Sequence, residues 1–576
     1  MRTKKLIPAL VSTLIAMSAA QAASPGVETT RNVYFGDLHL HTAYSFDAYV
    51  LMGAKANPDD AYRFARGEAV NYLGHTVQRD EPLDFLAVTD HSENLGVMNT
   101  LDDPNSALSK SEIGQRIKAD PRKAFWEVVK IFTSGQQLPG VDTRAVSQSA
   151  WAKEVEAANN NYQPGKFTTF IGYEWSSMPQ GKYNLHRNVI FKGDKPPLPF
   201  SSVDSKRPED LWSYLEKSRA QGVEAIAIPH NGNASGGLMY DWNDSDGKAI
   251  DQAYAERRAL NEPLTEISQG KGQSETHPTL SSSDEFASFE IFDQLLIGNE
   301  KSEVHGSYVR EAFGRGLVIK DRVGVNPYKY GVTGGSDFHN AFTTSSEKQY
   351  SGSVGGAGSD QEQPNTEQAR DLLSGKISSE APLPLITFGS GNLTAVWAEE
   401  NTRESIFDAF KRKETFATSG TKIKVRFFGG WNFDGKLLEK SDWTRTAYAQ
   451  GAAMGGDLPA KSGAAKKPRF AVWAVKDPNG ANLDRAQIVK VWLKNGGYGE
   501  KVFDVARSKG ATQLATVWED PEFDPKTPAV YYLRVLEVPT PRWSTILAEK
   551  RGLEAPKDRP KTIQERAWSS PIWYTP

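Results

Sequence analysis

Short apolar runs recur between residues 33 and 334 and are separated by longer amphipathic stretches. Several runs are almost entirely apolar, which is typical of strands buried on both faces. A strand followed by a helix, repeated several times, predicts a parallel α/β architecture with its active site at the carboxyl ends of the strands. The predicted strands cover residues 33–40, 84–89, 168–175, 188–191, 224–229, 287–293 and 330–334, and the helices cover residues 121–132, 145–158, 208–219 and 304–313.

Polar segments interrupt this alternation. Residues 231–283 are rich in Gly, Asn and Ser and favour an insertion or a mobile loop. Residues 351–358 form a Gly/Ser tract of the kind found in flexible loops. Asn401, with Glu404 three residues later, predicts the start of a helix that ends near Lys413.

The pattern becomes strand-like after residue 420. Residues 421–428 and 469–476 alternate between apolar and polar positions, and turn signals occupy residues 477–480 and 495–497. We therefore expect an α/β domain over about residues 30–420 with an insertion at 231–283. A β-rich region over residues 421–576 follows it.

Composition narrows the class of protein. Hydrophobic residues make up 38% of the chain and charged residues 24%, which indicates a folded chain with a large core. The formal net charge of −3 argues against a dedicated nucleic-acid binder, which would carry a basic excess. Because the chain has no cysteine, disulfide frameworks, thiolate metal sites and a cysteine nucleophile are excluded.

The N-terminal residues have the pattern of a bacterial secretory signal. Arg2, Lys4 and Lys5 precede a mostly apolar run over residues 6–20, and Ala20-Gln21-Ala22 supplies small residues for cleavage. The run is shorter than the roughly 20 residues that span a bilayer. We expect residues 1–22 to be a signal peptide cleaved near Ala22, leaving a periplasmic or secreted protein without a membrane anchor.

Histidines and carboxylates gather at the ends of the predicted strands. His39 and His41 are two residues apart, so on a strand both side chains point the same way and can chelate one cation. Each such motif alone is more often structural, but the whole set falls where strand ends converge. His75, His277 and His305 fall in helical or loop stretches and are expected to be ordinary histidines. The candidate ligands are His39, His41, Asp47, His91, Glu174, His186, His230, Asp337 and His339.

The order HxH, Asp, DH, Glu, His, PH, DxH resembles the PHP superfamily of metal-dependent hydrolases, named for polymerases and histidinol phosphatases. The resemblance covers about residues 30–420. It implies a distorted seven-stranded (β/α) barrel in which all nine residues bind metal, with Asp47 where some members have histidine. The sequences of residues 34–39 and 422–431 resemble a secreted bacterial branch described as a domain of unknown function.

Imidazole and carboxylate ligands without thiolate suit zinc, manganese or iron ions. Nine ligands are too many for one ion, so we expect two or three divalent ions with Glu174 as a bridge. The resemblance implies one ion held by His39, His41, Glu174 and Asp337, a second by Glu174, His186 and His230, and a third by Asp47, His91 and His339.

Clustered divalent ions lower the pKa of a bridging water and supply a hydroxide nucleophile. We expect a multinuclear hydrolase acting on a small-molecule ester, with Glu174 and Asp337 central to catalysis. Asp90 either orients a ligand or caps the turn that follows it. A phosphoesterase for mono- or diesters is favoured over a carboxylic ester or carbamate hydrolase. A metal-bearing binding protein without turnover is the second alternative, and no oligomeric state is predicted.

Overall fold

The computed structural model describes residues 31–134, 138, 140–298, 300–350, 366–375, 385–461 and 465–576. The expected signal peptide and the Gly/Ser tract at 351–358 lie outside these residues. None of the described helices combines the length and apolar character needed to cross a bilayer.

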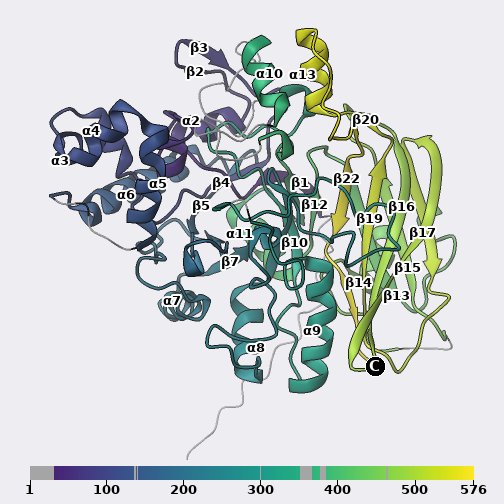
Figure 1. Ribbon diagram of the computed structural model, residues 1–576. Helices are drawn as coiled ribbons and strands as arrows, with labels where there is room; N and C mark the ends of the chain where they lie inside the picture. The colour runs from purple at the N-terminus through teal and green to yellow at the C-terminus, as the bar shows by residue number, and fades with distance from the viewer. Residues whose placement is uncertain are drawn as a thin grey trace, which may run out of the picture. The chain divides into compact units, whose positions relative to one another are not determined.

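A 12-stranded mixed sheet forms the framework (Figure 1). Its strand order is β17-β16-β19-β22-β12-β11-β1-β4-β5-β6-β7, and β23 pairs with β19. The strands are β1 (Asn32–Asp37), β4 (Phe85–Val88), β5 (Thr168–Trp175), β6 (Arg187–Phe191), β7 (Ala225–Pro229), β11 (Leu393–Ala398), β12 (Thr415–Thr418), β16 (Leu483–Lys494), β17 (Gly497–Ala511), β19 (Ala529–Glu537), β22 (Arg566–Ser569) and β23 (Ile572–Tyr574).

The expected parallel arrangement is only partly present. β1 pairs in parallel with β4 and β4 with β5, but β6 is antiparallel to both β5 and β7. Only a loop and a short 3-10 turn join β5 to β6, whereas parallel neighbours need a crossover, usually a helix. The prediction of a wholly parallel sheet is therefore wrong at β6.

Smaller sheets accompany this framework. β8 pairs with β10 in parallel, and this sheet contacts β7 and β12 without a hydrogen-bonded ladder between them. The described ladders therefore do not close into one seven-stranded ring. The remaining strands are β2 (Val70–Tyr72), β3 (His75–Val77), β8 (Leu264–Gln269), β9 (Gly272–Gln273), β10 (Gly331–Gly334), β13 (Lys424–Gly430), β14 (Gly451–Ala453), β15 (Arg469–Val475), β18 (Gln513–Glu519), β20 (Thr540–Pro541) and β21 (Thr562–Ile563).

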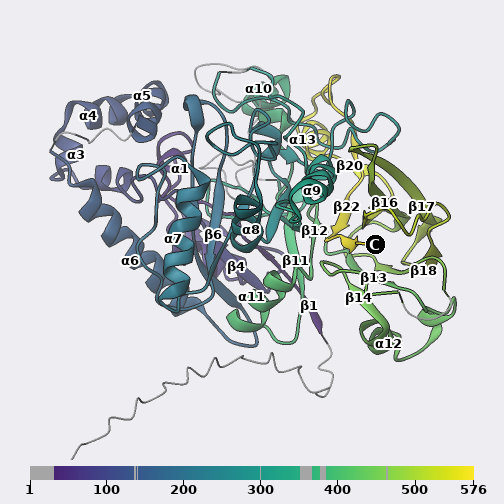
Figure 2. The same ribbon diagram turned by 90° about the horizontal axis from the view of Figure 1, so that it is seen from below.

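Helices pack on these sheets. Figure 2 shows α11 beside β11 and α12 beside β13 and β14, and α9 contacts β16 and β17. The helices are α1 (Phe46–Val50), α2 (Pro58–Ala65), α3 (Ala107–Lys110), α4 (Glu112–Ala119), α5 (Pro121–Ser134), α6 (Thr143–Asn161), α7 (Pro208–Ala220), α8 (Gln252–Asn261), α9 (Val309–Val323), α10 (Thr366–Ser374), α11 (Arg403–Arg412), α12 (Trp443–Gln450) and α13 (Trp543–Arg551).

The segment 231–283, expected to be a loop or insertion, contains α8 and β8. All six residues of β8 are buried although its sequence, LTEISQ, is largely polar. A strand whose buried side chains bind polar partners has no apolar run, so the pattern did not predict it. The opposite error occurs at residues 287–293, a predicted strand that forms turns instead. Its apolar side chains pack in different places, Phe292 against Phe388 and Phe289 against Trp568.

The helices near the site have a core of their own. The 3-10 turn at Met98–Asp102 and helices α3, α4 and α5 form what we call the helical cap. The apolar side chains of the cap pack with those of α1 in a separate cluster. Figure 1 shows α3, α4 and α5 grouped away from the large sheet.

The strands after residue 420 are joined to the large sheet. β22 pairs with both β12 and β19. The large sheet therefore contains strands from before and after residue 420 in one continuous ladder. A buried charge cluster adds a second connection. Arg534, on β19, binds Asp284 at 2.7 Å and Glu275 at 3.1 Å, and Arg310 binds the same two carboxylates.

Glu275→Ala would leave the guanidinium groups of Arg310 and Arg534 buried without this carboxylate. An incompletely paired buried charge is costly, so we expect the free energy of unfolding to fall by about 3–5 kcal/mol. The control Glu224→Ala breaks an exposed pair with Lys411 and should cost less than about 1 kcal/mol. Denaturation followed by circular dichroism measures both, and equal losses would contradict this role.

Candidate metal centre

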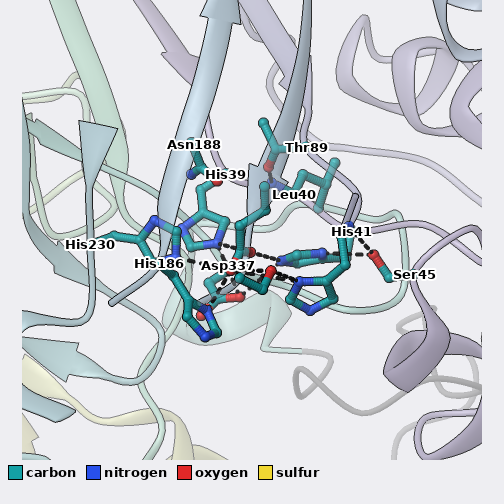
Figure 3. Close-up of polar contacts among 12 residues, drawn as sticks. His39, Leu40, His41, Ser45, Thr89, His186, Asn188, His230 and Asp337 are labelled. Carbon is teal, nitrogen blue, oxygen red and sulfur yellow. Dashed lines mark hydrogen bonds and ion pairs between the residues drawn. The ribbon is translucent and has the colours of Figure 1, made fainter. Parts of the chain in front are cut away.

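The nine candidate ligands meet at one edge of the strands. His39 and His41 follow β1, Glu174 lies in β5 and His230 follows β7. Because β6 is antiparallel to its neighbours, His186, just before β6, lies at the edge where β5 and β7 end. Figure 3 shows His39, His41, His186, His230 and Asp337 converging.

The loop after β10 completes this edge. Leu40 and Phe338 form an isolated parallel bridge, which holds the loops after β1 and β10 side by side. Asp337 has a left-handed backbone with φ of 53°, and its N–H donates to the His39 carbonyl at 2.8 Å. Residues other than glycine adopt this conformation at an energetic cost, and such positions concentrate at functional sites.

Glu174 lies at the centre of the cluster. Its side chain is 1% exposed, and both carboxylate oxygens face imidazole rings. Nitrogen atoms of five histidines lie within 3.6 Å of these oxygens: His39, His41, His91, His186 and His230.

Two further carboxylates face the same rings. Asp337 Oδ1 lies 3.3 Å from Nε2 of both His39 and His41. Asp47 Oδ2, from the first turn of α1, lies 3.1 Å from His339 Nε2. The structure therefore brings all nine sequence-predicted residues together.

Three overlapping groups hold their ligand atoms within 4.8 Å of one another. One group matches part of the first ion site that the resemblance implies. Asp47 and His186 belong to none of the groups, although Asp47 contacts His91 and His186 contacts Glu174. The groups are His39, His41 and Asp337; His39, Glu174 and His230; and His41, His91 and His339.

The carboxylates and imidazoles shift each other's proton affinity. Burial would raise the pKa of Glu174, but the surrounding imidazoles, above all that of His91, hold it well below its usual value. Burial would lower the pKa of His91, yet Glu174 and Asp47 raise it to about 10. A proton on His91 balances part of the buried carboxylate charge, a role that bound cations would take over.

The donor set fits divalent cations. His186 Nε2 and both ring nitrogens of His230 are buried and make no hydrogen bond. Burial and the neighbouring His39 lower the pKa of His230 to about 3, which keeps its imidazole neutral. A buried neutral imidazole with a free lone pair is the form that binds metal, and nitrogen and oxygen donors suit zinc, manganese or iron.

Residues outside the nine hold the ligands in place. Glu266 Oε2 lies 3.0 Å from His39 Nδ1, and Ser45 Oγ lies 2.9 Å from His41 Nδ1. Asp90 accepts a hydrogen bond from Ser45 Oγ at 2.6 Å, which supports an orienting role rather than a cap for the next turn. Partners on the second ring nitrogen fix the tautomer of a metal-binding histidine.

Lys271 is another residue that the sequence analysis missed. It is buried, and its ammonium contacts Asp337 Oδ2, which also accepts from Gln269 Nε2 at 2.8 Å. Burial would raise the pKa of Asp337, but Lys271 is the main group that holds it well below its usual value. Lys271 follows β8, the strand without an apolar signature.

Two of the histidines expected to be ordinary lie outside the cluster. His277 Nδ1 is 2.7 Å from Thr279 Oγ1, and His305 Nδ1 is 3.0 Å from Glu311. The third, His75, lies in the hairpin strand β3.

The fold and the site define a mixed α/β protein with a candidate divalent-metal centre. The chain belongs to DUF3604, described as a "protein of unknown function" family, whose model matches residues 28–510 and 506–576. No curated protein matches the chain. The chain is also similar to the crystal structure of a two-domain protein from Bacteroides vulgatus containing a "predicted PHP-like metal-dependent phosphoesterase". The TM-score is 0.31 at 11% identity, over 88% of this chain and 92% of that one.

Glu174→Gln keeps the shape of the central side chain but removes the charge that several imidazoles share. We expect the purified variant to lose at least half of its bound transition metal, because neutral amide oxygen is a weak ligand. His305→Ala, outside the cluster, should keep the wild-type content. Mass spectrometry of protein purified without chelator measures both, and unchanged metal in Glu174→Gln would contradict the assignment.

Removing metal should destabilise the folded chain. Without cations, only neighbouring imidazoles and Lys271 offset the negative charges of the buried carboxylates Glu174, Asp337 and Asp47. An ion that binds the folded chain at 100 times its Kd adds about 2.7 kcal/mol. A chelator should lower the Tm by several degrees, and Mn²⁺ or Zn²⁺ should restore it. The same Tm after verified metal removal would argue against metal binding.

Proposed function

We propose that the chain is a PHP-type metal-dependent hydrolase with a multinuclear centre, and that it acts as a phosphoesterase on mono- or diesters. The observation that carries the proposal is Glu174, a buried carboxylate within 3.6 Å of five imidazoles. The order of the nine residues along the chain supports the PHP assignment and its distorted barrel. Two or three zinc, manganese or iron ions fit the number of donors.

Bound divalent ions would supply a water of lowered pKa and would offset charge on the substrate. The protein's own part is to orient the donors. Glu174 presents both oxygens to separate histidines, while Glu266 and Ser45 fix the rings of His39 and His41. No serine or cysteine nucleophile is then needed.

Bound cations, together with the ammonium of Lys271, would favour phosphoryl over acyl chemistry. Phosphoryl transfer spreads negative charge over three oxygens, whereas acyl transfer develops one oxyanion. Lys271, buried against Asp337, adds a cationic donor to the ligand cluster. It can hydrogen-bond a phosphoryl oxygen once a cation takes over its contact with Asp337.

The proposal includes a periplasmic or secreted location and a small-molecule ester as substrate. The location rests on the basic residues and the apolar run that precede Ala22. The substrate class rests on the ligand cluster and on the absence of a basic excess in the composition.

For the metal-loaded protein, kcat/KM for phenyl phosphate or diphenyl phosphate should exceed that for phenyl acetate by at least about tenfold. Inorganic phosphate or vanadate should inhibit competitively, because each presents several oxygens to the same cations. Faster cleavage of phenyl acetate without inhibition by phosphate would replace the phosphoesterase by the carboxylic ester hydrolase. No turnover of either ester by fully metal-loaded protein would favour the binding protein.

A further inference from the structure

A pocket of about 960 Å³, part of it open to solvent, adjoins the candidate metal centre. Its lining includes cluster residues, among them Glu174, Asp337 and His339, together with Lys271. The lining continues past these residues onto other segments, so the pocket extends beyond the place of a phosphoryl group at the metal centre.

The lining also includes apolar side chains from other segments of the fold. Phe125, Trp126 and Val129 come from α5 of the helical cap, and Ile297 comes from the segment between β9 and α9. Phe46, on α1, connects the two groups of residues, because it packs against the apolar cluster of the cap and its ring centroid lies 5.4 Å from that of His91. An ester bound at the metal centre would therefore place its substituent against the cap.

We call Phe46, Phe125, Trp126, Val129 and Ile297 the apolar wall, and it borders a separate core cluster. Phe125 and Val129 are buried in the cluster of the helical cap, while Phe46 and Ile297 pack against it and remain partly exposed. Trp126 is 43% exposed, although a tryptophan at a folded surface normally buries most of its ring. Apolar side chains gathered in a pocket rather than scattered over the surface are typical of a ligand-binding wall.

We propose that this pocket binds an aromatic group of the substrate while the metal centre engages the ester. Phe46, Phe125 and Trp126 offer ring faces and edges, the contacts that a flat aromatic group makes best. The inference rests on the proposed function for the ester and on the helical cap for the aromatic group. The substrate class is thus an aryl or arylalkyl ester rather than a sugar or short-chain ester.

Non-hydrolysable phosphonates separate binding from leaving-group reactivity. Calorimetry on the metal-loaded protein compares methylphosphonate, phenylphosphonate and (1-naphthylmethyl)phosphonate, with 1-naphthylmethanol as a ligand that lacks the phosphoryl group. We expect at least about tenfold tighter binding from methyl to phenyl, and tighter again for naphthyl, because apolar pockets discriminate by this much for small increments of surface.

Two substitutions test the wall itself. Trp126→Ala removes an exposed ring and Ile297→Asp places a charge on the apolar face, so each should reduce the naphthyl-over-methyl preference about tenfold. The control Leu260→Ser changes a side chain that is 57% exposed on α8, away from the pocket, and should keep the wild-type preference.

The outcomes distinguish this inference from the proposed function. Equal binding of all three phosphonates would overturn the aromatic pocket even if phenyl phosphate is hydrolysed. If no phosphonate binds and no phosphate ester is cleaved, but 1-naphthylmethanol binds and Trp126→Ala weakens it, the phosphoesterase fails and the aromatic pocket stands. A preference unchanged in both wall variants would also overturn the inference.

Discussion

The buried carboxylate of Glu174 is the constraint on which the site depends. A charge at 1% exposure is stable only if opposite charge or several hydrogen-bond donors surround it. Here five histidines fill that shell. Glu266 contacts the ring of His39 and Ser45 that of His41, and Asp90 in turn binds Ser45. Polar groups occupy a place in the core that apolar side chains usually fill. Bound cations would balance the charge of these groups.

The convergence of the candidate ligands could be predicted from the sequence because most of them lie at or next to strand ends. A single chemical rule, that strand ends in α/β folds converge, was enough to group His39, Glu174 and Asp337 across about 300 residues. The direction of β6 was predicted wrongly, but this did not affect the grouping. His186 precedes an antiparallel strand and therefore lies at the same edge as the other ligands. The grouping of the ligands depends on the edge at which each residue lies and not on the direction of each strand.

The parts that were missed have two different causes. β8 carries Glu266 and leads to Lys271, yet its buried positions are largely polar, so hydrophobic periodicity had nothing to detect. Such a strand is stable only because distant residues satisfy it, as His39 does for Glu266. The apolar wall was missed for the converse reason. Its α5 side chains have ordinary helical spacing, and only the tertiary structure places Trp126 and Val129 in the same pocket as the ligands.

The pairing of β22 between β12 and β19 bears on how the chain reaches its native state. Thr415 and Ser570, which lie within 3.0 Å of each other, are 155 residues apart in sequence. Closing so long a loop is slow, and until β22 docks, β12 and β19 each present an unpaired strand edge. A chain in which β22 has not yet docked can pair with other chains through these two edges, so aggregation during refolding would compete with this contact.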